Sequence, residues 1–463
     1  MATKQQQKSN VIAIIAMFFL FAMISFVTNL AAPIGTIWGY KFEGNSMLGM
    51  MGNMMNFLAY LFMGIPAGNL LVKIGYKKTA LWAMAIGVIG LFVQWLSSAV
   101  GADTNLFEMT SMVKENGVEV AKTFVVPLNF IIYLLGAFIC GFCVCMLNTV
   151  VNPMLNLLGG GGNKGNQLLQ FGGALNSLSG TLTPLFVGML IGVLSKQTQI
   201  GDVNPLLFIG IGIFAVAFVI LSFVSIPEPN LSKGKKKAYS HSPWNFRHTV
   251  LGVIGIFFYV GIEIGIPGTL NFYLADQKAT GAGVVGDAST IAGAIVAIYW
   301  LLMLVGRTLS GFISGSISSR KQLIAVSATA IVLVVMAIFI PKTSTLPVPE
   351  FLYEGGAEVP VSAFLLILCG LCTSIMWGGI FNLAVEGLGK YTAQASGIFM
   401  MMVVGGGVMP LIQSAIAKAS GYMTSYWLVV AMLAYLLFYG LIGSKNVNTD
   451  IPVEEEPIDP RDL

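Results

Sequence analysis

The chain of 463 residues is too apolar to be a soluble globular protein. Hydrophobic residues make up 56% of it and charged residues only 10%, against about 25% charged in soluble domains. The mean hydropathy of +0.83 predicts an all-α polytopic membrane protein. The net charge of +4 is too small to indicate a nucleic-acid partner, and we expect none.

Twelve apolar segments follow one another along the chain, and each is long enough for a transmembrane helix of about 20 residues. Helices are expected because a transmembrane barrel would show short alternating strands instead. The segments lie at 11–39, 47–72, 79–100, 124–157, 167–195, 204–226, 248–275, 289–315, 321–341, 360–385, 392–418 and 424–443. An even number of spans puts both termini on one side of the membrane.

The polar stretches divide the chain into regions and orient it. We predict an N-terminal six-helix half (1–226), a cytoplasmic linker (227–247), a C-terminal six-helix half (248–443) and a solvated acidic tail (444–463). With the N-terminus inside, sixteen Lys and Arg residues fall on the cytoplasmic face and seven on the other. This excess predicts that both termini are cytoplasmic. The longer extracellular loops 101–123 and 342–359 indicate no function.

Three short patterns recur at nearly one offset. Gly68 followed by Lys77 and Lys78 matches Gly311 followed by Arg320 and Lys321, at an offset of 243 residues. The segments 180–185 (GTLTPL) and 406–411 (GGVMPL), and the pairs Gly141-Phe-Cys and Gly370-Leu-Cys, recur at 226 and 229 residues. Two six-helix halves arranged as parallel repeats are typical of the major facilitator architecture.

Glu263 is the one carboxylate that the sequence places at membrane depth, in the middle of the span 251–273. A charge there costs roughly 3 kcal/mol or more and usually marks a substrate or ion path. Arg307 is the other ionisable residue predicted deep in a span, and we expect the two to pair. The alternative is a protonated structural Glu bonded to a neighbouring helix.

Polar side chains inside the spans are the candidates for binding a substrate. Asn and Gln offer both a donor and an acceptor to hydroxyl groups, and aromatic rings offer a flat apolar face to a sugar ring. The alternative for each amide is an interhelical hydrogen bond worth about 0.6 kcal/mol. This neutral, amide-rich set favours a polyhydroxylated neutral solute. The predicted substrate-binding residues are Asn29, Asn148, Asn152, Asn176, Glu263, Asn271, Trp377, Asn382 and Gln413.

The segment GNLLVKIGYKK (68–78) matches the short-loop signature of the major facilitator superfamily in Gly68, Gly75, Lys77 and Lys78. Asn69 stands where an acidic residue is common. The resemblance implies a conformational latch, to which we also assign Arg307 and Arg320. Simple anchoring of positive charge on the cytoplasmic side is the alternative.

The chain as a whole resembles the fucose/glucose/galactose permease family, and its glucose/galactose branch more closely. The segments that carry the resemblance are 65–78 (IPAGNLLVKIGYKK), 152–159 (NPMLNLLG), 174–184 (ALNSLSGTLTP), 258–270 (FYVGIEIGIPGTL), 306–311 (GRTLSG), 374–392 (SIMWGGIFNLAVEGLGKYT) and 405–413 (GGGVMPLIQ). The resemblance implies a secondary transporter that imports a neutral hexose such as glucose or galactose by alternating access. It also implies a bacterial inner membrane.

Departures from the family pattern leave the coupling ion open. Proton-coupled fucose permeases carry acids where this chain has Asn29 and Asn148, and a Gln where it has Gly173. In one mechanism Glu263 carries the proton alone, and in a second it binds sodium together with Asn29 or Asn148. An uncoupled facilitator, in which Glu263 accepts a hydrogen bond from a sugar hydroxyl, is the third mechanism.

Other classes of function are disfavoured by what the spans contain. The spans contain one Glu, one Arg and no His, which are too few ionisable side chains to build the catalytic site of an intramembrane enzyme. A carrier of another neutral solute, such as an amino sugar or a small glycan, and a receptor that binds sugar without flux remain alternatives. The five Cys residues lie in apolar spans and are expected to be structural. We expect no metal site, no cofactor apart from a coupling sodium ion or proton, and a monomer in the lipid bilayer.

Overall fold

The structure is a computed structural model that describes residues 2–42, 46–115, 118–191, 197–228, 241–276, 280–350, 352–353 and 356–454. Its long helices are α1 (Ala2–Lys41), α2 (Ser46–Ala99), α3 (Leu128–Leu158), α4 (Gly162–Ile191), α5 (Asn204–Phe223), α6 (Arg247–Ala275), α7 (Ala288–Ile313) and α8 (Ser319–Phe339). The remaining helices are α9 (Val361–Ser374), α10 (Met376–Ala384), α11 (Thr392–Met401), α12 (Gly405–Ser420) and α13 (Tyr422–Phe438). Short helical turns adjoin them at η1 (Ile200–Val203), η2 (Pro243–Asn245), η3 (Gly389–Tyr391), η4 (Met402–Val404) and η5 (Tyr439–Gly443).

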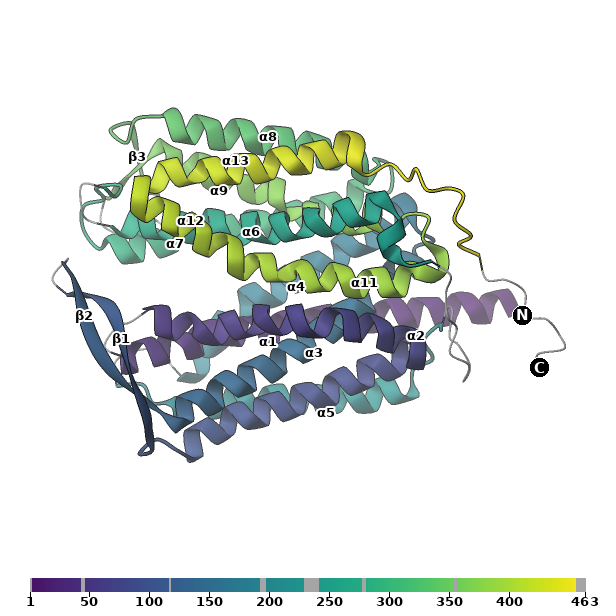
Figure 1. Ribbon diagram of the computed structural model, residues 1–463, viewed down its shortest axis with the longest axis horizontal. Coiled ribbons are helices and arrows are strands. Elements are labelled where there is room, and N and C mark those ends of the chain that lie inside the picture. The colour runs from purple at the N-terminus through teal and green to yellow at the C-terminus, as the bar shows by residue number, and fades with distance from the viewer. Residues whose placement is uncertain are drawn as a thin grey trace.

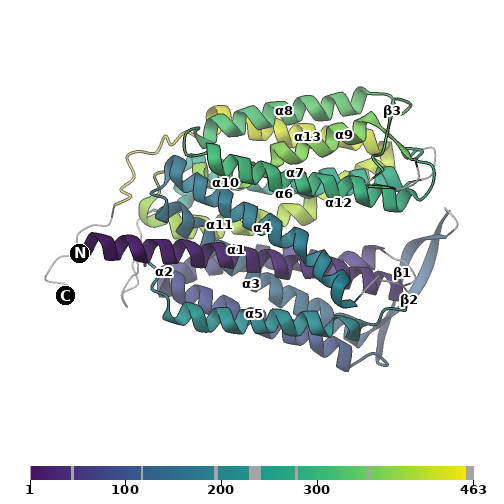
Figure 2. The same ribbon diagram turned by 180° about the vertical axis from the view of Figure 1, so that it is seen from behind.

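The helices form a membrane-spanning bundle. Ten helical stretches of the described chain are long and apolar enough to cross a membrane. One of them, in α2, covers 52 residues, about 78 Å at 1.5 Å per residue and more than twice the hydrocarbon thickness. Gly75, with φ 85° and ψ 173°, interrupts α2 and divides it into two spans. With α4, which runs alongside (Figures 1 and 2), the twelve spans expected from the sequence are present.

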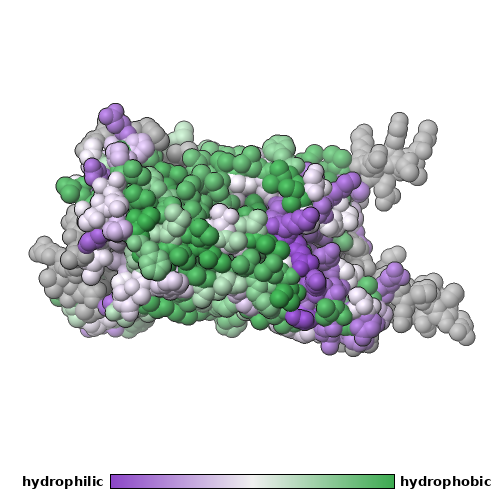
Figure 3. Space-filling model, turned by 90° about the horizontal axis from the view of Figure 1, so that it is seen from above, coloured by the Kyte–Doolittle hydropathy of each residue, from purple (hydrophilic) through white to green (hydrophobic). Residues whose placement is uncertain are grey.

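The spans lie side by side in two groups. In Figure 1, α6, α7, α8, α9, α12 and α13 form the upper group, and α1, α2, α3 and α5 form the lower group. Helices α4 and α11 lie between them; in chain order α4 belongs with the lower group, and α10 and α11 belong with the upper group. The start of α1 and the last described residues lie at one end, here named the terminal end; the opposite end, which carries strands β1 and β2, is named the hairpin end. Figure 3 shows a hydrophobic belt across the middle of one face, with hydrophilic residues toward both ends.

Each group of helices is braced at the terminal end by a basic residue from the repeated pattern. Lys77, just after the Gly75 break, donates from Nζ to the carbonyl of Ser222 near the end of α5, at 2.7 Å. Arg320 at the start of α8 donates from Nε to the carbonyl of Gly440 in η5, at 2.8 Å. The repeated basic residues thus make equivalent contacts in the two halves. Lys77 connects the third span to the sixth, and Arg320 connects the ninth span to the twelfth.

A β-hairpin replaces the loop expected at 101–123. Strands β1 (Asn105–Glu115) and β2 (Val118–Pro127) pair antiparallel, with Thr110 opposite Thr123. The expected helix start at residue 124 is therefore wrong: residues 124–127 finish β2, and α3 begins at Leu128 after Pro127. In the second long loop, β3 (Thr345–Pro347) pairs with β4 (Glu358–Pro360).

The described part of the tail, which the sequence predicts to be solvated, is largely exposed but also contacts the helix bundle. Asn448 accepts a hydrogen bond from the backbone N–H of Arg247 at 2.9 Å, and the carbonyl of Val453 accepts one from the N–H of Lys390 at 3.2 Å. Ile451 and Val453 also pack against the apolar core. These two apolar side chains and two hydrogen bonds hold the described part of the tail against the bundle. Glu455, Glu456 and the linker run Lys235–Lys237 lie outside the described residues.

Candidate functional site

The expected pairing of Glu263 with Arg307 is confirmed. Nη2 of Arg307 (α7) lies 3.0 Å from Oε1 of Glu263 (α6), and their side chains remain 12% and 14% exposed. A charge facing hydrocarbon would be costly, so membrane-embedded charges face a bundle interior or a water-filled path. We therefore place the open side of this pair toward the interior of the protein.

Arg307 also reaches across to the other group of helices. Its Nη1 donates to Ser177 Oγ at 2.6 Å and to the carbonyl of Gly173 at 3.3 Å, both in α4. Its Nε donates to the carbonyl of Ser374 in α9 at 3.2 Å. Arg307, which the sequence assigned to a cytoplasmic latch, thus lies beside Glu263 and connects α4 to α6, α7 and α9.

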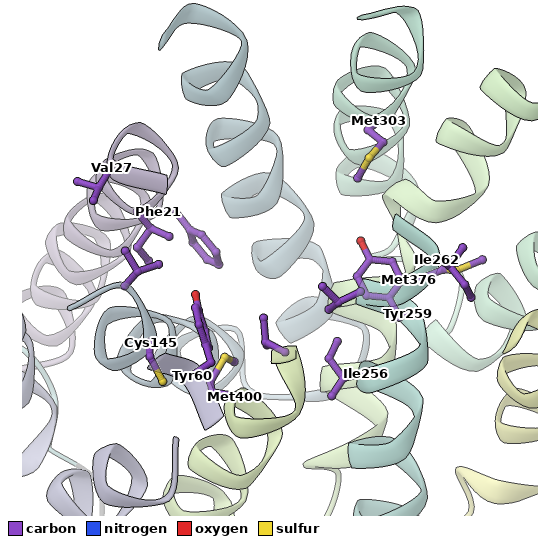
Figure 4. Close-up of a cluster of buried hydrophobic side chains, with 14 of the residues drawn as sticks. Phe21, Val27, Tyr60, Cys145, Ile256, Tyr259, Ile262, Met303, Met376 and Met400 are labelled. Carbon is purple, nitrogen blue, oxygen red and sulfur yellow. The ribbon is translucent and has the colours of Figure 1, made fainter. Parts of the chain in front are cut away.

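An aromatic and amide cluster adjoins the same α6 helix. Trp377 (α10) donates from Nε1 to Asn152 Oδ1 (α3) at 3.0 Å. Its ring packs on Tyr259 and Phe399, with centroids 6.2 and 5.8 Å apart. In Figure 4, Phe21 and Tyr60 lie on one side, and Tyr259 and Met376 on the other. Tyr259 is one helical turn from Glu263, so the indole, the phenol ring and the carboxylate belong to one site.

Three predicted amides are held within their own group of helices. Asn29 donates to the carbonyl and hydroxyl of Ser25, at 2.8 and 3.1 Å. Asn148 donates to the hydroxyl of Tyr60 at 2.8 Å, and Asn176 to the carbonyl of Phe21 at 3.1 Å. These bonds fix the side chains against α1 and α2.

The remaining predicted substrate residues are spread along the bundle. Gln413 (α12) is fully buried, and neither polar atom of its amide has a hydrogen bond. It points at Gly265 of α6, where an added Cβ would lie 2.4 Å from its Oε1. An orphaned buried amide is costly, which suits a group that meets a ligand or water. Asn271 is partly exposed, about 12 Å along α6 from Glu263 toward the hairpin end.

Asn382 belongs to a different feature, a set of contacts between the two groups of helices that we name the terminal-end seam. Asn382 accepts from Asn156 across the seam at 2.5 Å and donates to Ser319 within its own half at 2.9 Å. The other polar contacts of the seam are Asn166 to Ser314, Gln170 to the carbonyl of Ile375, and Ser396 to the carbonyl of Thr149. All of these lie closer to the terminal end than the contact between Arg307 and Ser177.

Close helix packing completes the seam. An added Cβ on Gly397 (α11) would lie 2.7 Å from the Cα of Gly68 (α2), closer than real Cβ contacts come, so this approach of the two helices requires Gly at position 397. Of the other predicted latch residues, Gly75 breaks the helix, and Lys77 and Arg320 brace their own groups. Lys78 is exposed.

The seam residues Asn156, Asn166 and Ser314 were not among the residues predicted from the sequence. One signal was available: Asn148, Asn152 and Asn156 recur every four residues, which places them on one face of a helix. Two consecutive members of this ladder cross to α10. Among the described residues, no group of three or more His, Cys, Asp or Glu side chains has the arrangement of a metal site. All five Cys residues are buried.

Comparisons with known proteins agree with this architecture. The family model described as Major Facilitator Superfamily matches residues 12–409. The chain is 30% identical over 452 residues to a glucose/galactose transporter of Brucella abortus, covering 95% of this chain and 96% of that protein. It is 22% identical to the L-fucose-proton symporter of Escherichia coli, covering 91% and 90%.

Solved structures show the same fold. The Escherichia coli fucose:proton symporter superposes with a TM-score of 0.74 at 18% identity, over 95% of this chain and all of that one. A proton:xylose symporter superposes with a TM-score of 0.67 at 12% identity, over 94% and 97%. The helix arrangement, the repeat and the family match lead to one conclusion. The chain belongs to the major facilitator superfamily.

Proposed function

We propose that this protein is a secondary transporter that imports a neutral monosaccharide, such as glucose or galactose, by alternating access of its two groups of helices. The observation that carries the proposal is the partly exposed Glu263–Arg307 pair at membrane depth, beside the aromatic cluster of Trp377 and Tyr259. A carboxylate and an indole face suit the hydroxyl and C–H sides of a sugar ring. The full-length similarity to a glucose/galactose transporter supports the same substrate class.

Glu263 is the coupling carboxylate in this proposal, loaded from outside by a proton or a sodium ion. Asn29 and Asn148 each donate a hydrogen bond inside their own group, and because an amide has no ionisable proton, neither replaces an acid as a proton carrier. The protein acts as a monomer in a bacterial inner membrane, with the terminal end in the cytoplasm. The seam contacts hold the two halves together at the terminal end, and closure on the cytoplasmic side corresponds to an outward-facing state.

The test is uptake of labelled sugars by purified protein in proteoliposomes. The panel is glucose, galactose, mannose, fucose and N-acetylglucosamine, first in counterflow and then under imposed proton or sodium gradients. We expect exchange of glucose or galactose, and accumulation under one of the two gradients. Exchange without accumulation identifies a facilitator. Absence of flux for every sugar refutes the proposal, and binding without flux identifies a receptor.

A further inference from the structure

Arg307 has a role that pairing with Glu263 alone does not explain. Two of its hydrogen bonds cross from α7 to α4, on Ser177 Oγ and the carbonyl of Gly173. These bonds join the two groups of helices that must separate at one end in alternating access. They therefore exist in some states of the transport cycle and not in others.

We propose that Arg307 is a clamp between the two halves, and that the charge on Glu263 sets how firmly it holds. While Glu263 is ionised, the clamp keeps the terminal-end seam closed. When Glu263 is neutralised, the clamp loosens and the seam opens more readily. The inference rests on the proposed function, because it names what controls alternating access at the same site.

Gly173 is the residue of α4 against which the Arg307 side chain packs. A Cβ added to Gly173 would lie 3.4 Å from Cδ of Arg307 and 3.7 Å from its Nε. The long Arg side chain thus lies against Gly173, where an added Cβ would make ordinary van der Waals contact with it. The position that departs from the permease pattern in the sequence is therefore one that Arg307 contacts and to whose carbonyl it donates.

Glu263 fixes the direction of the guanidinium group. Nη2 is held by Glu263 and Nε by the carbonyl of Ser374, so the planar group presents Nη1 to Ser177. A buried Arg that loses its carboxylate is left with an uncompensated charge. Because the side chain is 12% exposed, it has a route toward water and away from Ser177.

The clamp can be tested without any sugar by measuring the seam directly. Spin labels on Lys164→Cys (α4) and Ser316→Cys, both at exposed positions on opposite sides of the seam, report its width by pulsed electron resonance. The five native Cys residues are buried, so labelling is selective. The variants are Ser177→Ala, Glu263→Gln and the doubly neutral Glu263→Gln/Arg307→Gln. The matched control is Ser179→Ala, which loses only the bond to the carbonyl of Ala22 within its own half.

An open seam gives a longer distance between the two spin labels. We expect the ratio of molecules with this longer distance to those with the shorter one to rise about tenfold or more in all three variants, as is typical for losing a hydrogen bond to a charged group. Ser179→Ala should leave the distances unchanged. The clamp is refuted if Ser177→Ala and Glu263→Gln match Ser179→Ala. Ser177→Ala keeps the test decisive if the Glu263 variant does not fold. Sugar flux plays no part in this measurement, so the clamp and the proposed substrate fail separately.

Discussion

Gly64 of α2 lies against α11 without room for a side chain. An added Cβ would lie 2.5 Å from the backbone N of Met401, 2.6 Å from the carbonyl O of Gly397 and 2.7 Å from the Cα of Met401. Ordinary contact begins at 3.4 Å, so the shortest of these contacts is about 0.9 Å too close. All three partners are backbone atoms, and relief requires the two helices to move apart.

The substitution Gly64→Ala should therefore destabilise the closed seam. Overpacking of this kind costs typically about 1–3 kcal/mol, and it acts only in the state in which α2 and α11 touch. A difference of this size changes a two-state ratio by about 5-fold to 150-fold. We expect the spin-label distance between positions 164 and 316 to lengthen by a population shift in that range, with slower net uptake.

The matched control is Gly212→Ala in α5, where an added Cβ meets nothing within 4 Å. This control makes the same chemical change within a helix and carries the same gain in helix propensity. The reasoning is refuted if Gly64→Ala and Gly212→Ala give the same distance distribution and the same uptake rate.

Three further predictions concern the site and its support. Glu263→Gln should abolish gradient-driven uptake while equilibrium exchange of labelled sugar survives; unchanged accumulation would show that Glu263 is structural. Trp377→Ala should weaken sugar binding about tenfold or more in an equilibrium binding assay, since it removes the ring that packs on Tyr259. Trp377→Phe keeps a ring and should bind the sugar with intermediate affinity. Equal affinities of both variants and the parent would show that Trp377 is not part of the site. Glu228→Ala should lower the free energy of unfolding by about 1–2 kcal/mol. The reason is that the Glu228 carboxylate accepts hydrogen bonds from the backbone N–H groups of Tyr76 and Lys77 at 2.7 and 2.9 Å. A thermal-shift assay in which Glu228→Ala and Glu228→Gln both match the parent would contradict this role.

The sequence was sufficient for the spans and for the central ion pair. Hydrocarbon thickness dictates a length of about 20 apolar residues, which leaves few choices for where helices lie. Two opposite charges in an otherwise apolar bundle have few other partners, so the pairing of Glu263 with Arg307 follows from desolvation alone.

Other features depend on three-dimensional neighbours or on signals that were overlooked. The hairpin had a visible signal, since Asn116-Gly117 between alternating runs is typical of a two-residue turn. No local pattern separates an amide that meets a ligand from one that joins two helices. Asn382 bonds to Asn156 and Ser319, and Gln413 bonds to nothing, because of what the opposing helices present.

The contacts of Lys77, Glu228 and Arg320 at the terminal end have a consequence for the order in which the two halves fold during synthesis. The contacts of Lys77 with Ser222 and of Glu228 with Tyr76 and Lys77 need only the first 228 residues. They can form before α6 has left the ribosome, whereas the contact of Arg320 with Gly440 requires almost the entire chain to have been synthesised. Chains fold largely from the N-terminus during synthesis. The first half is thus expected to reach protease resistance as a nascent chain, and the second only after release.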